Sequence, residues 1–121
     1  MSKIILTVDD SRTMRDMLML ALTNAGYQVV QAEDGMHGLE VLQSTEPDVI
    51  ITDINMPRMD GFGFIEGVRG GDRHRAVPIL VLTTESDSLK KERARRAGAT
   101  GWIVKPFDPV KLVEAIRRVA A

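Results

Sequence analysis

The chain has 121 residues, a length typical of one domain whose core folds without disulfides or structural metals. Its 16 Lys and Arg nearly balance 17 Asp and Glu, which gives no reason to expect nucleic acid or an anionic membrane as the main partner. The absence of cysteine excludes disulfides and thiol nucleophiles. The first apolar run, Ile4 to Val8, is too short for a signal peptide or a membrane span, so we expect a cytoplasmic protein without membrane insertion.

Short apolar runs rich in β-branched residues and Leu predict strands that are buried on both faces. Segments with helical spacing of apolar residues lie between these runs and after the last one. Strands that alternate with helices predict an α/β fold with a parallel sheet covered by helices on both faces. The predicted strands are Ile4–Val8, Val29–Val30, Val49–Ile51, Ile79–Leu82 and Trp102–Val104.

In two of the predicted helices, the sequence indicates which side chains are buried. In the helix after the first strand, Met14 and Met17 lie at helical spacing and are expected to fill the core. The segment 87–97 is rich in Lys, Arg and Glu, so that only Leu89 and two alanines remain to be buried. We expect a short, weakly anchored helix there.

Side chains that can bind ions or take part in reactions follow most of the predicted strands. Asp9 and Asp10 come after the first strand, Asp53 closes the third, Thr83 follows the fourth and Lys105 follows the fifth. A single Asp at a strand end is more often an ordinary solvated residue. The carboxyl ends of parallel strands meet at one edge, however, so we expect these five residues to converge.

Three crowded carboxylates repel each other unless a cation lies among them. Mg²⁺ suits such a site, because it prefers oxygen ligands and keeps several waters. With the ion in place, Asp53 could attack a phosphoryl group and form an aspartyl-phosphate. Lys105 and Thr83 could then contact the phosphoryl oxygens.

The segment from Asp53 to Gly61, DINMPRMDG, resembles the phosphoacceptor signature of two-component response-regulator receiver domains. The other motifs of that family occur in the same order and spacing, so the resemblance covers essentially the whole chain and predicts one receiver domain over residues 1–121. These motifs are Val8–Ser11 (VDDS), Leu82–Thr84 (LTT), Gly98–Ala99 and Lys105–Phe107 (KPF).

The resemblance implies a flavodoxin-like (CheY-like), doubly wound, five-stranded parallel sheet in the order 2-1-3-4-5 with five helices. It implies that Asp53 is phosphorylated and that Asp10, Asp53 and the backbone carbonyl of Asn55 bind Mg²⁺. Asp9 would act mostly through a metal-bound water. Lys105 would contact the phosphate, and the bond between Lys105 and Pro106 would be cis.

The family's switch pair corresponds to Thr83 and Trp102. In relatives, the hydroxyl moves to the phosphate and the aromatic ring moves inward, which changes the surface made by the fourth helix, fifth strand and fifth helix. Tyr or Phe is usual at position 102. An indole needs more room and a partner for its N–H group, so the sequence leaves open whether Trp102 moves fully inward.

The function implied is that of a signalling protein, not a metabolic enzyme, which catalyses its own phosphorylation and dephosphorylation. A monomer would accept phosphate from a sensor histidine kinase and bind a downstream protein. Asn55 and Glu85 are similar to the corresponding residues of fast-cycling chemotaxis regulators, which favours the flagellar motor switch as the target.

The sequence leaves other functions open. The main alternative is a phosphorelay intermediate or phosphate sink that exchanges phosphate with a histidine phosphotransfer protein. A receiver cut from a DNA-binding regulator is disfavoured because no linker follows Val119. An Mg²⁺-dependent phosphatase typically needs a second Asp at position 55, which is Asn55. A flavin module is disfavoured because Asp9 and Asp10 would repel the flavin phosphate.

Overall fold

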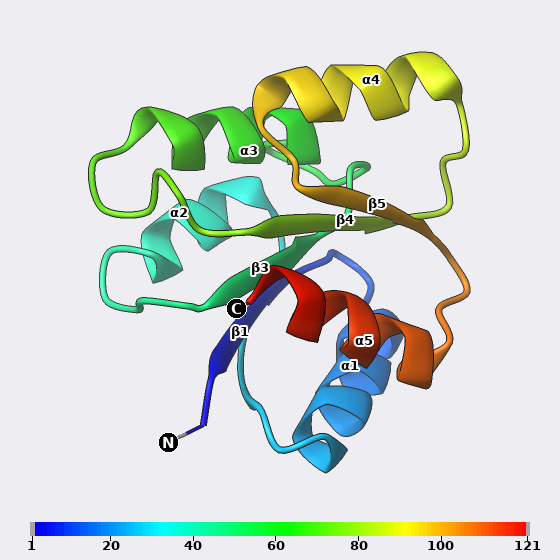
Figure 1. Ribbon diagram of the computed structural model, residues 1–121. Coiled ribbons are helices and arrows are strands. Elements are labelled where there is room, and N and C mark those ends of the chain that lie inside the picture. Colours follow the sequence, from blue (N-terminus) through cyan, green and yellow to red (C-terminus); the bar gives the residue numbers. More distant parts are fainter. Residues whose placement is uncertain (1, 121) are drawn as a thin grey trace.

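The computed structural model of the chain describes residues 2–120, and it contains a single five-stranded sheet in which all neighbouring strands are parallel (Figure 1). The strand order is β2-β1-β3-β4-β5, which confirms the order 2-1-3-4-5. The strands are β1 (Ile4–Val8), β2 (Gln28–Ala32), β3 (Val49–Thr52), β4 (Ile79–Thr83) and β5 (Gly101–Val104).

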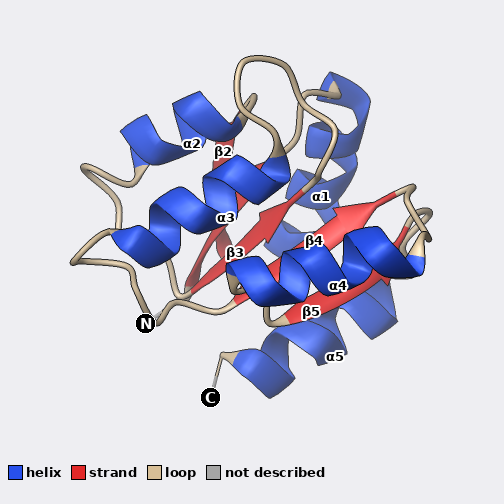
Figure 2. Cartoon of the chain, turned by 90° about the horizontal axis from the view of Figure 1, so that it is seen from above, coloured by secondary structure: helices blue, strands red, loops and turns tan. Residues whose placement is uncertain are grey.

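Helices cover both faces of the sheet, with α1 and α5 on one side and α2, α3 and α4 on the other (Figures 1 and 2). Two apolar clusters fill the layers, because successive residues of a strand point to opposite faces. One contains Ile50 and Phe64, and the other contains Ile51 and Leu112. The helices are α1 (Arg12–Asn24), α2 (Gly35–Val41), α3 (Gly61–Gly70), α4 (Ser88–Ala97) and α5 (Pro109–Val119).

Each helix begins after a residue whose side chain accepts a hydrogen bond from a backbone N–H of the first turn. An N-cap of this kind typically contributes about 1 kcal/mol to stability. It also fixes where the loop after each strand ends, so the functional edge of the sheet is bordered by well-defined helix starts. The caps are Ser11, Asp34, Asp60, Asp87 and Asp108.

Two expectations about buried side chains were wrong. Met14 packs against the core, but Met17 is 46% exposed, because α1 turns Leu18 and Leu22 toward the sheet instead. Leu89 is 79% exposed, and Ala94 is the buried residue of α4. The expectation of a weakly anchored helix in this segment is confirmed.

The start of α3 lies very close to the backbone after β3. A Cβ atom at Gly61 would collide with the carbonyl oxygen of Asp53 and would lie 2.8 Å from the Cα of Ile54. The Gly61 N–H donates to the carbonyl of Ile54 at 2.8 Å. Glycine is therefore required here, and it holds the loop after Asp53 tightly folded.

Within residues 2–120, every helix is too short or too polar to traverse a lipid bilayer.

Candidate functional site

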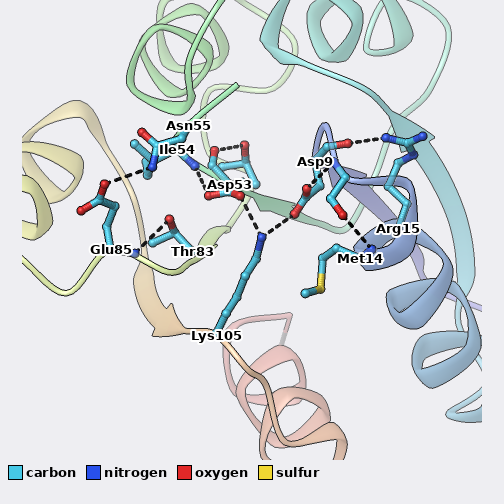
Figure 3. A network of polar contacts seen from close by, with 11 residues as sticks. Asp9, Met14, Arg15, Asp53, Ile54, Asn55, Thr83, Glu85 and Lys105 are labelled. Carbon is cyan, nitrogen blue, oxygen red and sulfur yellow. Dashed lines mark hydrogen bonds and ion pairs between the residues drawn. The ribbon is translucent and has the colours of Figure 1, made fainter. Parts of the chain in front are cut away.

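The expected site residues meet at the carboxyl edge of the sheet (Figure 3). Asp9 follows β1, Asp53 follows β3, Thr83 ends β4 and Lys105 follows β5. Backbone hydrogen bonds extend the sheet to these positions: the N–H of Asp53 donates to the carbonyl of Val8 at 2.9 Å, and that of Lys105 donates to the carbonyl of Thr83 at 2.8 Å. The parallel pairing thus brings together residues that are distant in sequence.

The amine of Lys105 bridges two carboxylates. Its Nζ lies 2.8 Å from Oδ2 of Asp53 and 3.0 Å from Oδ2 of Asp9. All three groups are largely buried: Asp9 is 2% exposed and Asp53 is 8% exposed, while the Lys105 side chain is 11% exposed. The bond between Lys105 and Pro106 is cis, as the family resemblance implied.

Burial and pairing act in opposite directions on these groups. Burial raises the pKa of Asp9 above its ordinary value, although the Ser11 N–H and Lys105 work against the increase. Burial alone would lower the pKa of Lys105, but hydrogen bonds from its amine to Asp53 and Asp9 outweigh that effect and raise it. Lys105 is therefore a firmly charged ammonium group beside Asp53.

Asp9, Asp10 and Asp53 each offer one carboxylate oxygen, and these oxygens all lie within 4.8 Å of one another. Asp10 is exposed, whereas the other two are buried. Oxygen ligands at this spacing fit a small divalent cation such as Mg²⁺, which needs few protein ligands and completes its shell with waters. Asn55 lies two residues after Asp53, in the loop between β3 and α3.

Thr83 and Trp102, the expected switch pair, are connected through Glu85. The buried hydroxyl of Thr83 accepts a hydrogen bond from the N–H of Glu85 at 3.3 Å. The indole Nε1 of Trp102 donates to the carbonyl of Glu85 at 3.2 Å, and its ring is partly buried against the core. The indole N–H therefore has its partner without full burial of the ring.

Sequence reasoning missed one residue of the site and one contact of a residue that it had named. Arg15 donates from Nη1 to the carbonyl of Asp9 at 2.6 Å, so Lys105 is accompanied by a second nearby cation. Its position in the first turns of α1, where the helix dipole disfavours cations, was a usable signal. Glu85 was named with Asn55 from the family resemblance, but their contact was not: Oε1 of Glu85 accepts a hydrogen bond from the Asn55 side chain at 3.0 Å. No sequence pattern indicates that contact.

The fold and this carboxylate-rich edge are those of the CheY-like α/β class, and comparison with known proteins agrees. The sequence model of the response regulator receiver domain matches residues 5–117. The chain therefore belongs to the response-regulator receiver family and is a receiver domain of a two-component system.

Individual relatives point in the same direction. The chain is 39% identical to chemotaxis protein CheY1 of Helicobacter pylori over 117 residues, which cover 95% of this chain and 94% of the relative. The structure of the chemotaxis response regulator CheY4 of Vibrio cholerae matches with a TM-score of 0.92 and 44% identity, covering 98% of this chain and 99% of that one.

A third relative bears on the metal site. The receiver domain of sensor histidine kinase PA1611 from Pseudomonas aeruginosa matches with a TM-score of 0.92 and 26% identity, covering 99% of this chain and 98% of that one. That structure is described with a magnesium ion coordinated in the active site cleft. In this chain, the carboxylates of Asp9, Asp10 and Asp53 gather at the carboxyl edge of the sheet.

Proposed function

We propose that this receiver domain accepts a phosphoryl group on Asp53 and works as a phosphorylation-activated switch. The observation that carries the proposal is the bridge from Lys105 Nζ to Asp53 and Asp9, beside a cluster of three carboxylates. A carboxylate oxygen of Asp53 attacks the phosphorus of the donor. The bond from phosphorus to the donor's leaving group breaks as the acyl-phosphate forms.

The surrounding residues have distinct roles in this proposal. Lys105 remains protonated and contacts an oxygen of the phosphoryl group, while the Thr83 hydroxyl donates to another. Asp9, Asp10, Asp53 and the backbone carbonyl of Asn55 would hold Mg²⁺, with Asp9 acting mostly through water. A bound ion would supply positive charge that neutralises the transferring phosphoryl oxygens.

Switching follows from the contacts of Thr83. When its hydroxyl turns to the phosphoryl group, it leaves the N–H of Glu85, whose carbonyl accepts from Trp102. Trp102 also lines a cavity of about 240 Å³ between α4 and β5, together with Arg95 and Ala99. Phosphorylation at Asp53 is thereby linked to the surface of α4, β5 and α5, which we infer to be the output surface.

We infer that a sensor histidine kinase supplies the phosphoryl group and that the output surface binds a downstream protein. The names of the relatives CheY1 and CheY4 favour chemotaxis, and with it the flagellar motor switch as the target. Residues 1–121 would then act as one cytoplasmic, monomeric receiver domain that catalyses its own phosphorylation and dephosphorylation.

A phosphorelay intermediate or phosphate sink is the second candidate. It is favoured by exposed apolar residues on α1, where Met17 is 46% exposed and Leu20 is 65% exposed. Exposed apolar side chains on one helix suit contact with another protein's helices. Transfer of phosphate from Asp53 back to a histidine phosphotransfer protein would favour this candidate over the motor switch.

The proposal is tested by incubating the protein with acetyl phosphate, with and without Mg²⁺, and measuring the intact mass. We expect a gain of one phosphoryl group that requires Mg²⁺, together with a change in the fluorescence of Trp102, the one tryptophan of the chain. A protein that gains no phosphoryl group under these conditions would contradict the proposal.

A further inference from the structure

Glu85 contacts four parts of the molecule. Its Oε1 accepts from Asn55 in the loop after β3 at 3.0 Å and from Lys90 Nζ in α4 at 3.0 Å. Its backbone N–H and carbonyl bond to Thr83 in β4 and to Trp102 in β5. Figure 3 shows the carboxylate extended toward Asn55, beside Thr83. The position of Glu85 is therefore shared between the site and the α4–β5 surface.

Lys90 contributes a specific contact to this arrangement. It lies in the first turn of α4, where the helix dipole disfavours a cation, and its amine is directed to a carboxylate outside the helix. Its side chain is 43% exposed, and that of Glu85 is 27% exposed. Lys91, the next residue, is exposed on the same turn and lies outside the contacts of Glu85.

The carboxylate of Glu85 places a negative charge beside the proposed phosphorylation site. The carboxylate accepts hydrogen bonds from Asn55 and from Lys90, and an exposed or half-buried glutamate is ionised at neutral pH. Without Lys90, the Glu85 carboxylate would keep its hydrogen bond from the uncharged side chain of Asn55 but would lose the cation that compensates its negative charge beside the site. An anionic phosphoryl donor approaching Asp53 would then meet an unpaired carboxylate.

We propose that Lys90 is a positioning residue that holds and neutralises the Glu85 carboxylate, and thereby raises the rate of phosphoryl transfer from anionic donors to Asp53. The inference rests on the proposed function of Asp53. It also links the first turn of α4 to the site, so a partner that binds α4 and displaces Lys90 would slow phosphorylation.

The test compares Lys90→Met with the matched control Lys91→Met, which removes the same charge from the same helix turn. Met is unbranched like Lys, one atom shorter, and similar in helix propensity. Each variant is incubated with acetyl phosphate and Mg²⁺, and the rate of adduct formation is followed by intact mass. We expect Lys90→Met to slow the reaction about three- to fivefold, the size expected for a partly exposed ion pair, and Lys91→Met to leave it nearly unchanged.

A double-mutant cycle separates positioning from a general effect on the helix. In a Glu85→Gln background, Lys90→Met should have almost no effect on the rate, because the charge that it neutralises is gone. With phosphoramidate, a donor that carries less negative charge, Lys90→Met should also have a smaller effect. Thermal unfolding of each variant checks that it is folded.

Equal slowing by Lys90→Met and Lys91→Met, or slowing by Lys90→Met that persists with Glu85→Gln, would overturn the role of Lys90. Wild-type protein that is phosphorylated at the same rate as Lys90→Met would overturn this inference alone. If wild-type protein formed no adduct, the proposed function would fail and this inference with it.

Discussion

The amine of Lys105 lies 2.8 Å from Oδ2 of Asp53, and the two residues are separated by 52 positions in the sequence. The contact is largely shielded from water, and the same amine also reaches Asp9 at 3.0 Å. Lys105 is therefore the cation that compensates two buried carboxylates before any phosphoryl group arrives.

Replacing Lys105 by Met should destabilise the protein in metal-free buffer by about 1–3 kcal/mol, because Asp9 and Asp53 lose their shared cation while remaining buried. Urea unfolding in the presence of a chelator measures the effect. Lys111→Met is the control, because Lys111 is exposed on α5. The role assigned to Lys105 is wrong if both variants unfold at the same urea concentration.

Mg²⁺ should stabilise the folded protein, since it binds the native cluster of Asp9, Asp10 and Asp53. At ten times its dissociation constant, the gain in unfolding free energy is about 1.4 kcal/mol. Asp10→Asn should remove most of this gain. Because Asp10 is exposed and adds negative charge to the cluster, the same variant should be at least as stable as wild type without metal. Equal stabilisation of both proteins by Mg²⁺ would show that the ion binds elsewhere.

Trp102→Phe tests the bond to the Glu85 carbonyl. The variant keeps an aromatic ring but loses the N–H donor, so we expect a stability loss of about 0.5–1.5 kcal/mol.

Thr83→Ala should still form the phosphoryl adduct, more slowly, while the fluorescence response of Trp102 is reduced. A full response of Trp102 in Thr83→Ala would mean that the signal reaches the indole by another route.

The ion pair between Asp34 and Arg58 should make stability depend on acidic pH. Arg58 Nε lies 2.8 Å from Oδ2 of Asp34, and hydrogen bonding from Arg58 lowers the pKa of that carboxyl below 3.8. The stabilisation is therefore present above pH 3.8 and is lost as the pH falls through the lower pKa of the folded state.

Asp34→Asn isolates this effect, because Asn is an equally good N-cap for α2. Wild type should be more stable than Asp34→Asn at neutral pH, and the difference should disappear in acid. Thermal unfolding measured between neutral and strongly acidic pH gives the comparison. A difference that stays constant across this range would exclude the ion pair as its source.

Much of the fold was predictable because β-branched apolar runs and helical spacing alternate along the chain. The convergence of Asp9, Asp53 and Lys105 followed from the geometry of a parallel sheet alone. The strand order and the cis bond before Pro106 came from family resemblance, since neither has a local signal that distinguishes it from alternatives.

Other features depend on which way a side chain points. Met17 and Leu89 lie at positions that suit burial in an ideal pattern, yet both are exposed because their helices contact the sheet along a narrower face. The contacts of Glu85 with Asn55 and Lys90 join a loop, a strand end and a helix. Such contacts require the three-dimensional arrangement, because no fixed spacing connects these positions.

The most direct test of the central claim is to locate the phosphoryl group in protein treated with acetyl phosphate and Mg²⁺. Peptide mass spectrometry under conditions that preserve acyl-phosphates should place one phosphoryl group on Asp53, and Asp53→Asn should remain unmodified. An adduct on another residue, or one that forms equally well in Asp53→Asn, would contradict the account.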